Sequence, residues 1–218
     1  MKTHIYISIA AALLIAASCD KMNQLEPQGG NSLTSQVLQT NQTVPSRINA
    51  SFNGMFTKLG APDSVFGSGR PDDWGFLMIG FSGDIEAADV VLVNSGYNWF
   101  STCGALTSRN ADYANPYVRY AAPYNEIAAA NEVIRSYPEG TTEQAAIYNI
   151  AQAHAIRAFA YLNLAPYFQF GYIAGGQNLP CVPLVTEETT DFTDNPRASV
   201  EDVYALIISD LDYAIKNL

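Results

Sequence analysis

The apolar residues between positions 143 and 165 recur with the period of an α-helix. At about 100° per residue, one helical face collects Ile147, Ala151, Ala155, Ala158, Leu162 and Ala165. The opposite face is also apolar and carries Ala153, Ile156, Ala160 and Leu164. A helix that is apolar nearly all round is a buried one, so we predict that other helices pack around this segment. Pro166 lacks a backbone donor and crowds the preceding turn, so the helix is predicted to end or kink near Ala165.

Three other segments show a helical period and are predicted to pack with this central helix. They run from Pro45 to about Leu59, from about Val118 to Ser136, and from Ser199 to the last residue. A short link joins the second of them to the central helix, and so short a link favours an antiparallel helix pair. The sequence therefore predicts a mainly all-α fold.

Two details bear on where these helices begin. Pro123 lies inside the second segment, and proline suits the first turn of a helix, so that helix starts either near Val118 or at Pro123. Ser199 is followed three residues later by Asp202, which resembles a capping box with Asp in place of Glu. This pattern predicts that the last helix begins at Ser199.

Two long irregular regions interrupt the helices. Residues 61–115 contain repeated glycines and two prolines, and within them residues 75–81 and 89–94 are predicted to form short strands or helical turns. Residues 167–198 are also rich in Gly and Pro and are predicted to be an extended connection. A long irregular region inside a compact domain is usually functional or disordered, and the aromatic and amide residues of the first region argue against disorder.

Composition and charge narrow the class of protein. Hydrophobic residues make up 48% and charged residues 15% of the 218 positions, which is typical of a globular domain. The chain is long enough to bury a substantial core in one domain. Its formal net charge of −10, without a cluster of Lys and Arg, argues against binding to nucleic acid.

The amino terminus has the pattern of a lipoprotein signal. Lys2 and His4 precede an apolar run over residues 5–17, and Ser18 and Cys19 follow that run. In such a signal the cysteine sulfur is lipidated and becomes the first residue of the mature protein. The alternative is an ordinary signal peptide with a chance cysteine.

This pattern divides the chain into three predicted parts. Residues 1–18 are predicted to be a lipoprotein signal peptide, residues 19–43 a polar tether and residues 44–218 a helical domain. Lipidation of Cys19 is expected to hold the mature protein on a membrane surface without crossing the bilayer.

The sequence shows no pattern that predicts catalysis or metal binding. No P-loop, GxGxxG or GxSxG motif occurs, and the single mature histidine, His154, is expected to be a satisfied core residue. Cys103 and Cys181 form either a disulfide or, as the large predicted core favours, two unpaired thiols. We therefore predict a protein that is not an enzyme and that holds neither a zinc ion nor another cofactor.

Arg157 lies in the central predicted helix, where an unpaired cation would be costly. We expect it to pair with a carboxylate of a neighbouring helix, either Asp210 or Glu126. The expected role of this pair is structural.

An aromatic group in the first irregular region is the strongest candidate for ligand contact. It consists of Trp74, Tyr97, Asn98 and Trp99. A flat aromatic face with adjacent amides suits a sugar, because a pyranose presents C–H groups to the ring while its hydroxyls exchange hydrogen bonds with polar side chains. The alternative is that the tryptophans anchor the loop on the helices, and taken alone the pattern favours that alternative.

Several segments share their order and spacing with one known protein family. They are LEP (25–27) shortly after Cys19, YNEIAAANEVI (124–134), IRAFAYLNLAPYF (156–168) with PLV (183–185), and PRASVEDVYALIISDLDYAIKNL (196–218). The matching positions are Tyr124, Ile127 and Asn131; Arg157, Ala158, Tyr161 and Leu164; and Arg197, Ser199, Val200, Tyr204, Ile207, Asp210, Leu211 and Ala214. On these residues the chain resembles the SusD/RagB family of outer-membrane nutrient-binding lipoproteins of Bacteroidetes.

The resemblance implies TPR-like helix pairs with long irregular loops, in which residues 143–165 pair with residues 118–136. It implies capture of an oligosaccharide or another nutrient at the outer face of the outer membrane, without catalysis, and a SusC-like TonB-dependent transporter as partner. Members of that family are usually more than twice as long, so the expected fold is an incomplete SusD-like one. The competing hypothesis is a helical scaffold lipoprotein that binds protein partners and whose aromatic residues belong to the core.

Overall fold

The computed structural model describes residues 45–218 except 88, 94–97, 108–109, 111 and 191. The predicted signal peptide, the predicted tether and Cys19 lie outside the described residues, and so does the candidate residue Tyr97. Lipidation and the three-part division of the chain therefore stay predictions.

The described part is mainly helical, which confirms the predicted fold class. Its elements are α3 (Pro45–Lys58), α4 (Gly75–Glu86), α5 (Ser101–Gly104), α6 (Ala114–Arg135), α7 (Gln144–Phe168), the 3₁₀ helix η1 (Tyr172–Ala174), β1 (Pro180–Pro183), β2 (Arg197–Ser199) and α8 (Val200–Asn217). None of the helices in the described ranges combines the length and the apolar character needed to cross a bilayer.

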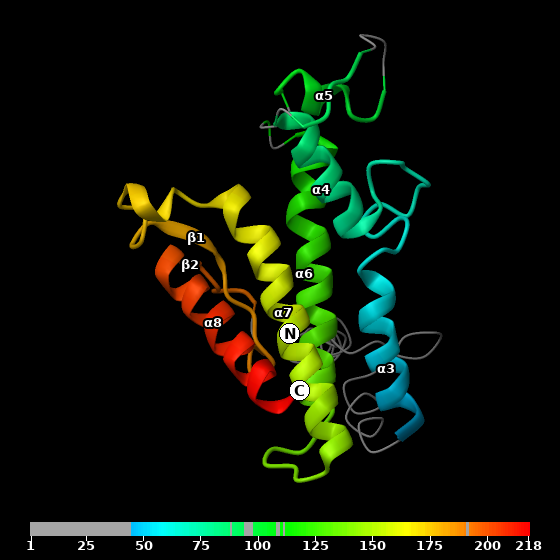
Figure 1. Ribbon diagram of the computed structural model, residues 1–218, viewed down its shortest axis with the longest axis vertical. Helices are drawn as coiled ribbons and strands as arrows, with labels where there is room; N and C mark the ends of the chain where they lie inside the picture. Colours follow the sequence, from blue (N-terminus) through cyan, green and yellow to red (C-terminus); the bar gives the residue numbers. More distant parts are fainter. Residues whose placement is uncertain (1–44, 88, 94–97, 108–109, 111, 191) are drawn as a thin grey trace, which may run out of the picture. The chain divides into compact units, whose positions relative to one another are not determined.

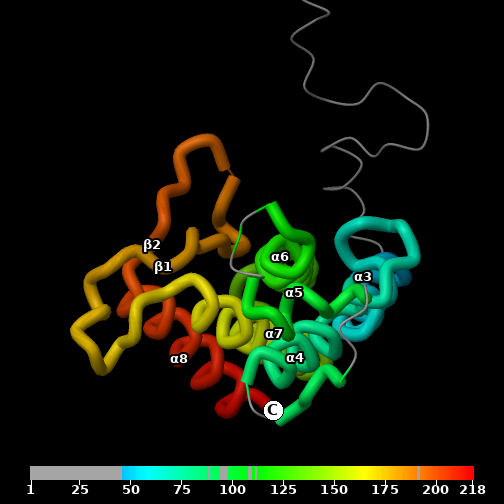
Figure 2. Tube along the Cα trace, turned by 90° about the horizontal axis from the view of Figure 1, so that it is seen from above, coloured from blue at the N-terminus to red at the C-terminus, as the bar shows by residue number. Residues whose placement is uncertain are grey.

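Helix α7 lies between α6 and α8, and α3 packs against α6 (Figure 1). Helices α6 and α7 run antiparallel, as their short link predicts, and the view along the helices in Figure 2 shows α7 between its two neighbours. The main core lies along α7 and consists of Ile127, Ala158, Ala160, Tyr161, Leu164, Ala165, Cys181, Val182, Val200, Val203 and Ile207. A second cluster joins α3, α6 and α7 through Met55, Ala130, Val133 and Ala153. The small side chains of α7 let both neighbouring helices approach closely.

The prediction that other helices pack around α7 is confirmed, but α7 is not buried over its whole circumference. Leu162, which belongs to the predicted buried face, is 46% exposed, and Tyr148, Phe159 and Tyr167 are also exposed. Helices α6 and α8 flank α7 on two sides, so a strip between them stays open to solvent. An apolar helix surface therefore allows burial, and the number of helices that pack against it decides how much of that surface is buried.

Two helix boundaries differ from the sequence predictions because prolines are tolerated inside the helices. Helix α6 begins at Ala114 and contains Pro123 in its interior, and α7 continues past Pro166 to Phe168. Pro166 removes one hydrogen bond to the carbonyl of Leu162. Because both residues are exposed, water can satisfy that carbonyl, and the helix does not have to end there.

The second irregular region is more ordered than an extended connection. Strands β1 and β2 pair antiparallel, with Pro180 opposite Ser199 and an irregular register toward Pro183. The Arg197 guanidinium donates to the carbonyls of Phe168 (2.7 Å) and Pro180 (3.1 Å), which ties the region to the end of α7. These strands precede α8, and the predicted cap is present, because Ser199 Oγ accepts from the Asp202 backbone N–H at 3.1 Å.

In the first irregular region, residues 75–81 form the start of α4 and not a strand. Gly75 has a φ of +56°, and a Cβ there would lie 2.6 Å from the Leu59 carbonyl oxygen. Only glycine fits this close approach, which lets the Phe76 N–H donate to the same oxygen at 3.2 Å. The contact links the start of α4 to the segment that follows α3.

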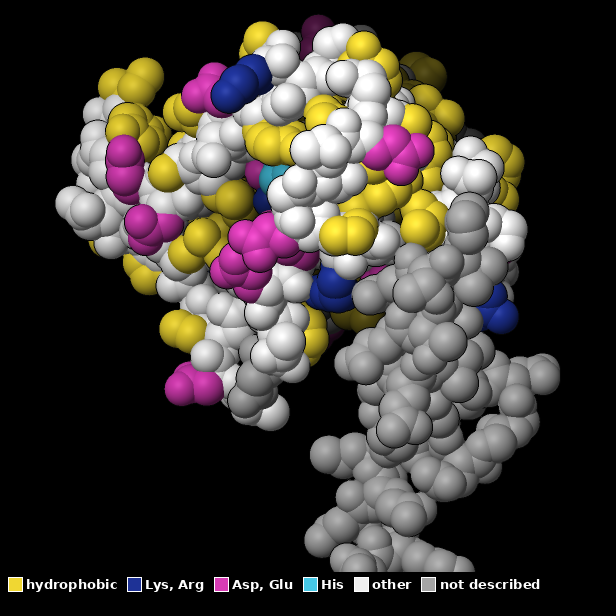
Figure 3. Space-filling model, turned by 90° about the horizontal axis from the view of Figure 1, so that it is seen from below, with side chains coloured by type: hydrophobic (Ala, Val, Ile, Leu, Met, Phe, Trp, Pro, Cys, Tyr) yellow, Lys and Arg dark blue, Asp and Glu magenta, His cyan; other side chains and the backbone are white. Residues whose placement is uncertain are grey.

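Both cysteines in the described part are free and buried, as predicted: Cys103 in α5 and Cys181 in β1. Burial raises the pKa of each thiol, although Arg119 partly opposes this at Cys103 and Arg197 does so at Cys181. Seen from below in Figure 3, hydrophobic side chains reach the surface between polar ones, and Asp and Glu side chains gather near the centre of this face.

Candidate functional site

The loop between α3 and α4 is folded around two carboxylates. Asp73 is fully buried and accepts hydrogen bonds from Ser64 Oγ (2.6 Å) and the N–H groups of Val65 (3.0 Å) and Phe66 (2.7 Å). Asp63 in turn accepts from the N–H groups of the next turn, including that of Ser68 at 3.1 Å. A carboxylate that collects several N–H groups fixes a loop without regular structure.

This loop places Arg70 between two aromatic rings. The guanidinium carbon lies 4.9 Å from the ring centroid of Phe66 and 4.6 Å from that of Trp99. Asp72, which is 2% exposed, accepts from Arg70 Nε at 3.0 Å and Nη2 at 2.8 Å. The bidentate ion pair and the two rings hold the Arg70 side chain in one orientation.

Two hollows share Arg70, Tyr113 and Ala114 in their linings, and together they are called the cleft below. The inner hollow has a volume of about 230 Å³ and is lined by Arg70, Asp72, Asn98, Trp99, Ser101, Thr102, Tyr113, Ala114 and Asn115. The outer hollow has a volume of about 560 Å³ and is lined by Phe66, Arg70, Asp112, Tyr113, Ala114 and Tyr117. Three separate segments thus supply one site: the α3–α4 loop, the start of α5 and the start of α6.

The polar side chains at the base of the inner hollow are held by one another. Asn115 is 4% exposed, donates from Nδ2 to Asp72 at 3.3 Å and accepts from the Thr102 hydroxyl at 2.7 Å. Asn98 Oδ1 accepts from the Phe100 N–H at 2.9 Å. The cleft therefore combines exposed ring faces with amide and carboxylate groups at fixed positions, which is the chemistry that suits a polyhydroxylated ligand.

The structure brings together only part of the predicted ligand group. Asn98 and Trp99 line the inner hollow, whereas Trp74 lies at the start of α4, is 44% exposed and is not among the residues that line either hollow. Sequence reasoning missed the contributions of the α3–α4 loop and of the start of α6. A signal for the latter was available in the tyrosines at positions 113 and 117, directly before the predicted helix.

A second polar cluster lies inside the helical layer around Arg157. Its Nε and Nη2 donate to the two carboxylate oxygens of Asp210 on α8 at 2.7 and 2.8 Å, so the predicted ion pair is present. Its Nη1 donates to Asn131 Oδ1 on α6 at 2.7 Å and to the Glu187 carboxylate. One guanidinium therefore connects α6, α7, α8 and the segment that follows β1.

The carboxylates of this cluster stay ionised. Burial alone would raise the pKa values of Asp210 and Glu187, but hydrogen bonds from Arg157 outweigh burial and lower both pKa values. Burial alone would also lower the pKa of Arg157, and its hydrogen bonds to the same carboxylates raise that pKa instead. The charges of the cluster thus stabilise one another.

Glu126, the alternative partner predicted for Arg157, does not pair with it. Glu126 lies on α6 about 140° around the helix from Asn131, the α6 residue that contacts Arg157. Within the described part of the chain, Glu126 Oε1 has no hydrogen-bond partner. Burial raises the pKa of Glu126 to about 7, and Lys58 opposes the shift only in part.

His154 is a packed residue within the Arg157 cluster. Its Nδ1 lies 2.7 Å from Asp210 Oδ1, and its ring lies 4.4 Å from the Tyr213 ring. The described residues contain no group of three or more His, Cys, Asp and Glu placed to hold a metal ion.

Comparison with known proteins places the chain in a family. The family described as "Starch-binding associating with outer membrane" matches residues 82–218, which include α6, α7 and α8. The chain therefore belongs to the SusD-like family. The SusD-like protein P38 of Formosa agariphila is 26% identical over the whole of this chain. That alignment covers 39% of the Formosa protein, so this chain spans well under half of the relative's length.

Solved structures show the same fold. A SusD-like carbohydrate binding protein from Bacteroides vulgatus is 27% identical and superposes with a TM-score of 0.66 over 79% of this chain and 35% of that one. A SusD superfamily protein from Bacteroides fragilis, 22% identical, gives a TM-score of 0.54 over 78% of this chain and 38% of that one. The helical layer and its loops thus correspond to one part of a longer SusD-like fold.

Proposed function

We propose that this protein is a cell-surface lipoprotein that captures a glycan, or another nutrient, in the cleft and passes it to a SusC-like TonB-dependent transporter. The observation that carries the proposal is the cleft itself, where the exposed rings of Trp99 and Tyr113 line the same hollow as the buried side chains of Asp72 and Asn115. Membership of the SusD-like family supports this assignment. The similar protein from Bacteroides vulgatus is described as carbohydrate binding.

The chemistry of the cleft supports a binding role without catalysis. Aromatic faces contact the C–H groups of a pyranose, and the amide and carboxylate groups orient its hydroxyls. Glycoside hydrolysis needs two carboxyl groups placed across the scissile bond. Two carboxyl groups line the cleft, Asp72 and Asp112, and Asp72 is already engaged by Arg70 and Asn115, which leaves it poorly suited to transfer protons.

The cellular placement follows from the predicted signal at Cys19. A lipid chain on Cys19 would hold the domain at the outer membrane, where a domain facing the exterior meets glycans before they reach the transporter. Radiolabelled palmitate incorporation into the wild-type protein, and its loss in Cys19→Ala, tests this placement.

The affinity of two tryptophan variants tests the site. Trp99→Ala removes a ring from the inner hollow and is expected to weaken glycan binding about tenfold or more, since stacked aromatic groups dominate such contacts. Trp74→Ala removes a comparably exposed ring that lies outside both hollows. Titration calorimetry on both variants, with thermal melting to verify folding, distinguishes the outcomes. Full affinity in Trp99→Ala would exclude the cleft, and a loss confined to Trp74→Ala would move the site to the start of α4.

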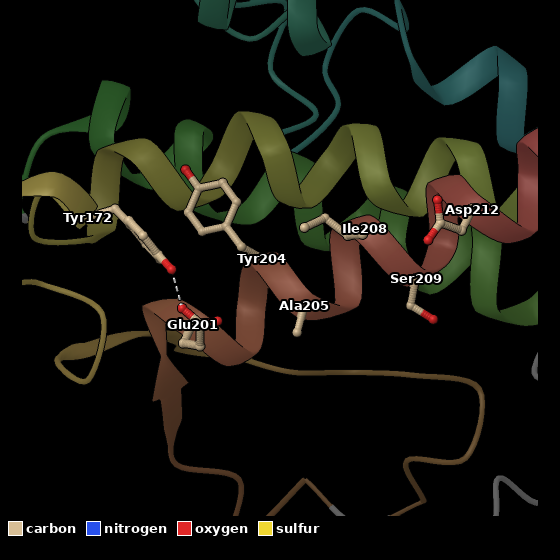
Figure 4. A pocket seen from close by; sticks show the side chains of 7 residues that line it. All are labelled: Tyr172, Glu201, Tyr204, Ala205, Ile208, Ser209 and Asp212. Atoms are coloured by element: carbon tan, nitrogen blue, oxygen red, sulfur yellow. Dashed lines mark hydrogen bonds between the residues drawn. The ribbon is translucent and has the colours of Figure 1, made fainter.

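A second candidate function, a scaffold that binds a protein partner, is favoured by the outer face of α8. Apolar residues there repeat at alternating steps of four and three, which is the spacing of a coiled-coil seam: Tyr204, Ile208, Leu211, Ile215 and Leu218. The last four are between 38% and 79% exposed. A hollow of about 740 Å³ adjoins this face. In Figure 4, Tyr172 and Glu201 lie at one end of its lining and Asp212 at the other, with Tyr204 and Ile208 between them. This surface suits an amphipathic helix that carries Lys or Arg beside its apolar seam.

Matched charge substitutions test this second function. Ile208→Glu places a charge in the seam, and Phe192→Glu makes a similar change at a site that is 65% exposed outside α8. If α8 holds the transporter, the transporter co-purifies with the wild type and Phe192→Glu but not with Ile208→Glu. A zero-length carbodiimide cross-link from Asp212 to a transporter lysine would establish the charged contact. Co-purification that survives Ile208→Glu would contradict it.

A further inference from the structure

We propose that the cleft recognises the end of an oligosaccharide, with the terminal sugar in the inner hollow and the next units in the outer hollow. This inference rests on the proposed glycan-binding function and adds the class of ligand. A site for chain ends differs from an open groove, which accepts the interior of a polysaccharide.

The size of the inner hollow limits it to one sugar. Its volume of about 230 Å³ corresponds to roughly eight water molecules at about 30 Å³ each, which is room for one pyranose with its hydroxyls. The outer hollow, at about 560 Å³, is more than twice as large. The two hollows therefore suit one terminal unit followed by two or more further units.

Buried polar side chains line the inner hollow. Asp72 and Asn115 are 2% and 4% exposed and bond to each other, and the Thr102 hydroxyl donates to Asn115. A sugar that enters past Arg70 meets these two buried side chains. The hydroxyls of the terminal sugar would face the amide and carboxylate groups there.

The boundary between the hollows is rigid. Arg70, Tyr113 and Ala114 line both of them, and Arg70 is fixed by Asp72 and by the rings of Phe66 and Trp99. A rigid boundary keeps the two parts distinct when no ligand is bound. Widening the inner hollow for a continuing chain would break the Arg70–Asp72 pair, whose carboxylate is buried.

The outer hollow offers a platform for the units that follow. The rings of Phe66 and Tyr117 lie 5.5 Å apart between centroids and are inclined at 42°. Phe66 is 40% and Tyr117 is 52% exposed, so both rings present area to a ligand. Contacts with ring faces tolerate different linkages between sugar units. Most of the selectivity between glycans is therefore expected at the inner hollow.

Calorimetry with chemically blocked glycans tests this inference. A panel of α-glucan, β-glucan, xylan and mannan oligosaccharides of one to seven units identifies the tightest binder. That glycan is then compared with two derivatives, one reduced to the alditol and one methylated at the terminal non-reducing O4. One of the two modifications is expected to weaken binding about tenfold or more, because a blocked hydroxyl leaves buried polar groups without partners. Affinity is expected to stop rising beyond about three or four units.

Each other outcome has a defined meaning. End recognition would be overturned, and glycan capture left intact, if both derivatives bound as tightly as the unmodified glycan and affinity kept rising with chain length. Absence of binding across the whole panel would contradict this inference and the glycan form of the proposed function, and would leave capture of another nutrient. Tyr117→Ala adds an internal measure, since it is expected to lower the ratio of trisaccharide to monosaccharide affinity. An unchanged ratio in the folded variant would show that the Tyr117 ring does not contact the second and third sugars.

Discussion

The α6–α7–α8 layer and the α3–α4 loop both bury charged side chains, but they satisfy those charges in opposite ways. In the layer, Arg157 takes its partners from residues 26 to 53 positions away, on other elements. In the loop, Asp63 and Asp73 collect hydrogen-bond donors that lie five to nine residues away. The first arrangement joins separate elements into one unit, and the second gives a local segment its shape.

The difference shows why one molecule can hold a regular scaffold and an irregular site. Removing a long-range partner should loosen several elements together, whereas removing a local carboxylate should disturb one loop and the cleft that depends on it. Substitutions in both regions separate these effects.

Arg157→Met should break the layer. The substitution leaves Asp210 and Glu187 without their cation, and breaking a buried ion pair costs about 3–5 kcal/mol. Urea unfolding followed by circular dichroism measures the free energy of unfolding. Arg47→Met is the matched control, because Arg47 is exposed on α3 and an exposed charge should contribute less than about 1 kcal/mol. Equal losses in the two variants would show that the Arg157 cluster does not hold the layer.

Asp73→Asn should disturb the loop more than the layer. The substitution replaces a carboxylate that accepts hydrogen bonds from Ser64, Val65 and Phe66 by an amide. The free energy needed to open the loop is expected to fall by about 2–3 kcal/mol. Hydrogen exchange should show faster exchange for the N–H groups of residues 65 and 66, with α7 unchanged. If α7 also lost protection, the loop would not be an independent local unit.

Glu126→Gln should stabilise the layer at and above neutral pH. The pKa of Glu126 is raised to about 7 by burial, above its ordinary value of 4.5, so the folded protein holds this proton more tightly than the unfolded chain. The stability that this proton contributes is complete below about pH 4.5 and is lost as the pH rises through about 7. Above that pH the variant should exceed the wild type by about 3 kcal/mol, with little difference at pH 4.5. Denaturant midpoints between pH 4 and 8 check this, and parallel profiles would contradict it.

Ser199→Ala should have the smallest effect of the four. It removes the acceptor for the Asp202 N–H at the start of α8 and should cost about 1 kcal/mol. Ser209→Ala, at a position inside α8, is the control for the change in helix propensity. A thermal melt that shows the same midpoint for both variants would mean that the cap is replaced by water.

The sequence predicted the helical layer well, because helical periodicity is a local property that survives in almost any tertiary setting. Helix α8 begins directly after Ser199, as the capping pattern indicates, and α7 covers almost all of the predicted central helix. Prolines were the main source of boundary errors. Their local cost is one hydrogen bond, which an exposed carbonyl can replace with water.

The cleft was predicted only in part, because its members come from three separate segments. Asn98 and Trp99 were visible as an aromatic and amide pair, but nothing local to Arg70 shows that its side chain lies beside Trp99. That position depends on Asp63 and Asp73, which fold the intervening loop by collecting its N–H groups. Such a pattern has no fixed spacing and thus leaves no periodic signal.

The sequence by itself determined the mainly helical fold, the membership of the SusD-like family and the need for a partner at Arg157. Tertiary structure decided that this partner is Asp210 and not Glu126, that Trp74 lies apart from Trp99, and that α7 keeps an exposed strip. The physical reason is that periodicity and burial cost are properties of single residues and their near neighbours. Which side chains meet depends on how helices rotate against one another and on which donors a buried carboxylate reaches.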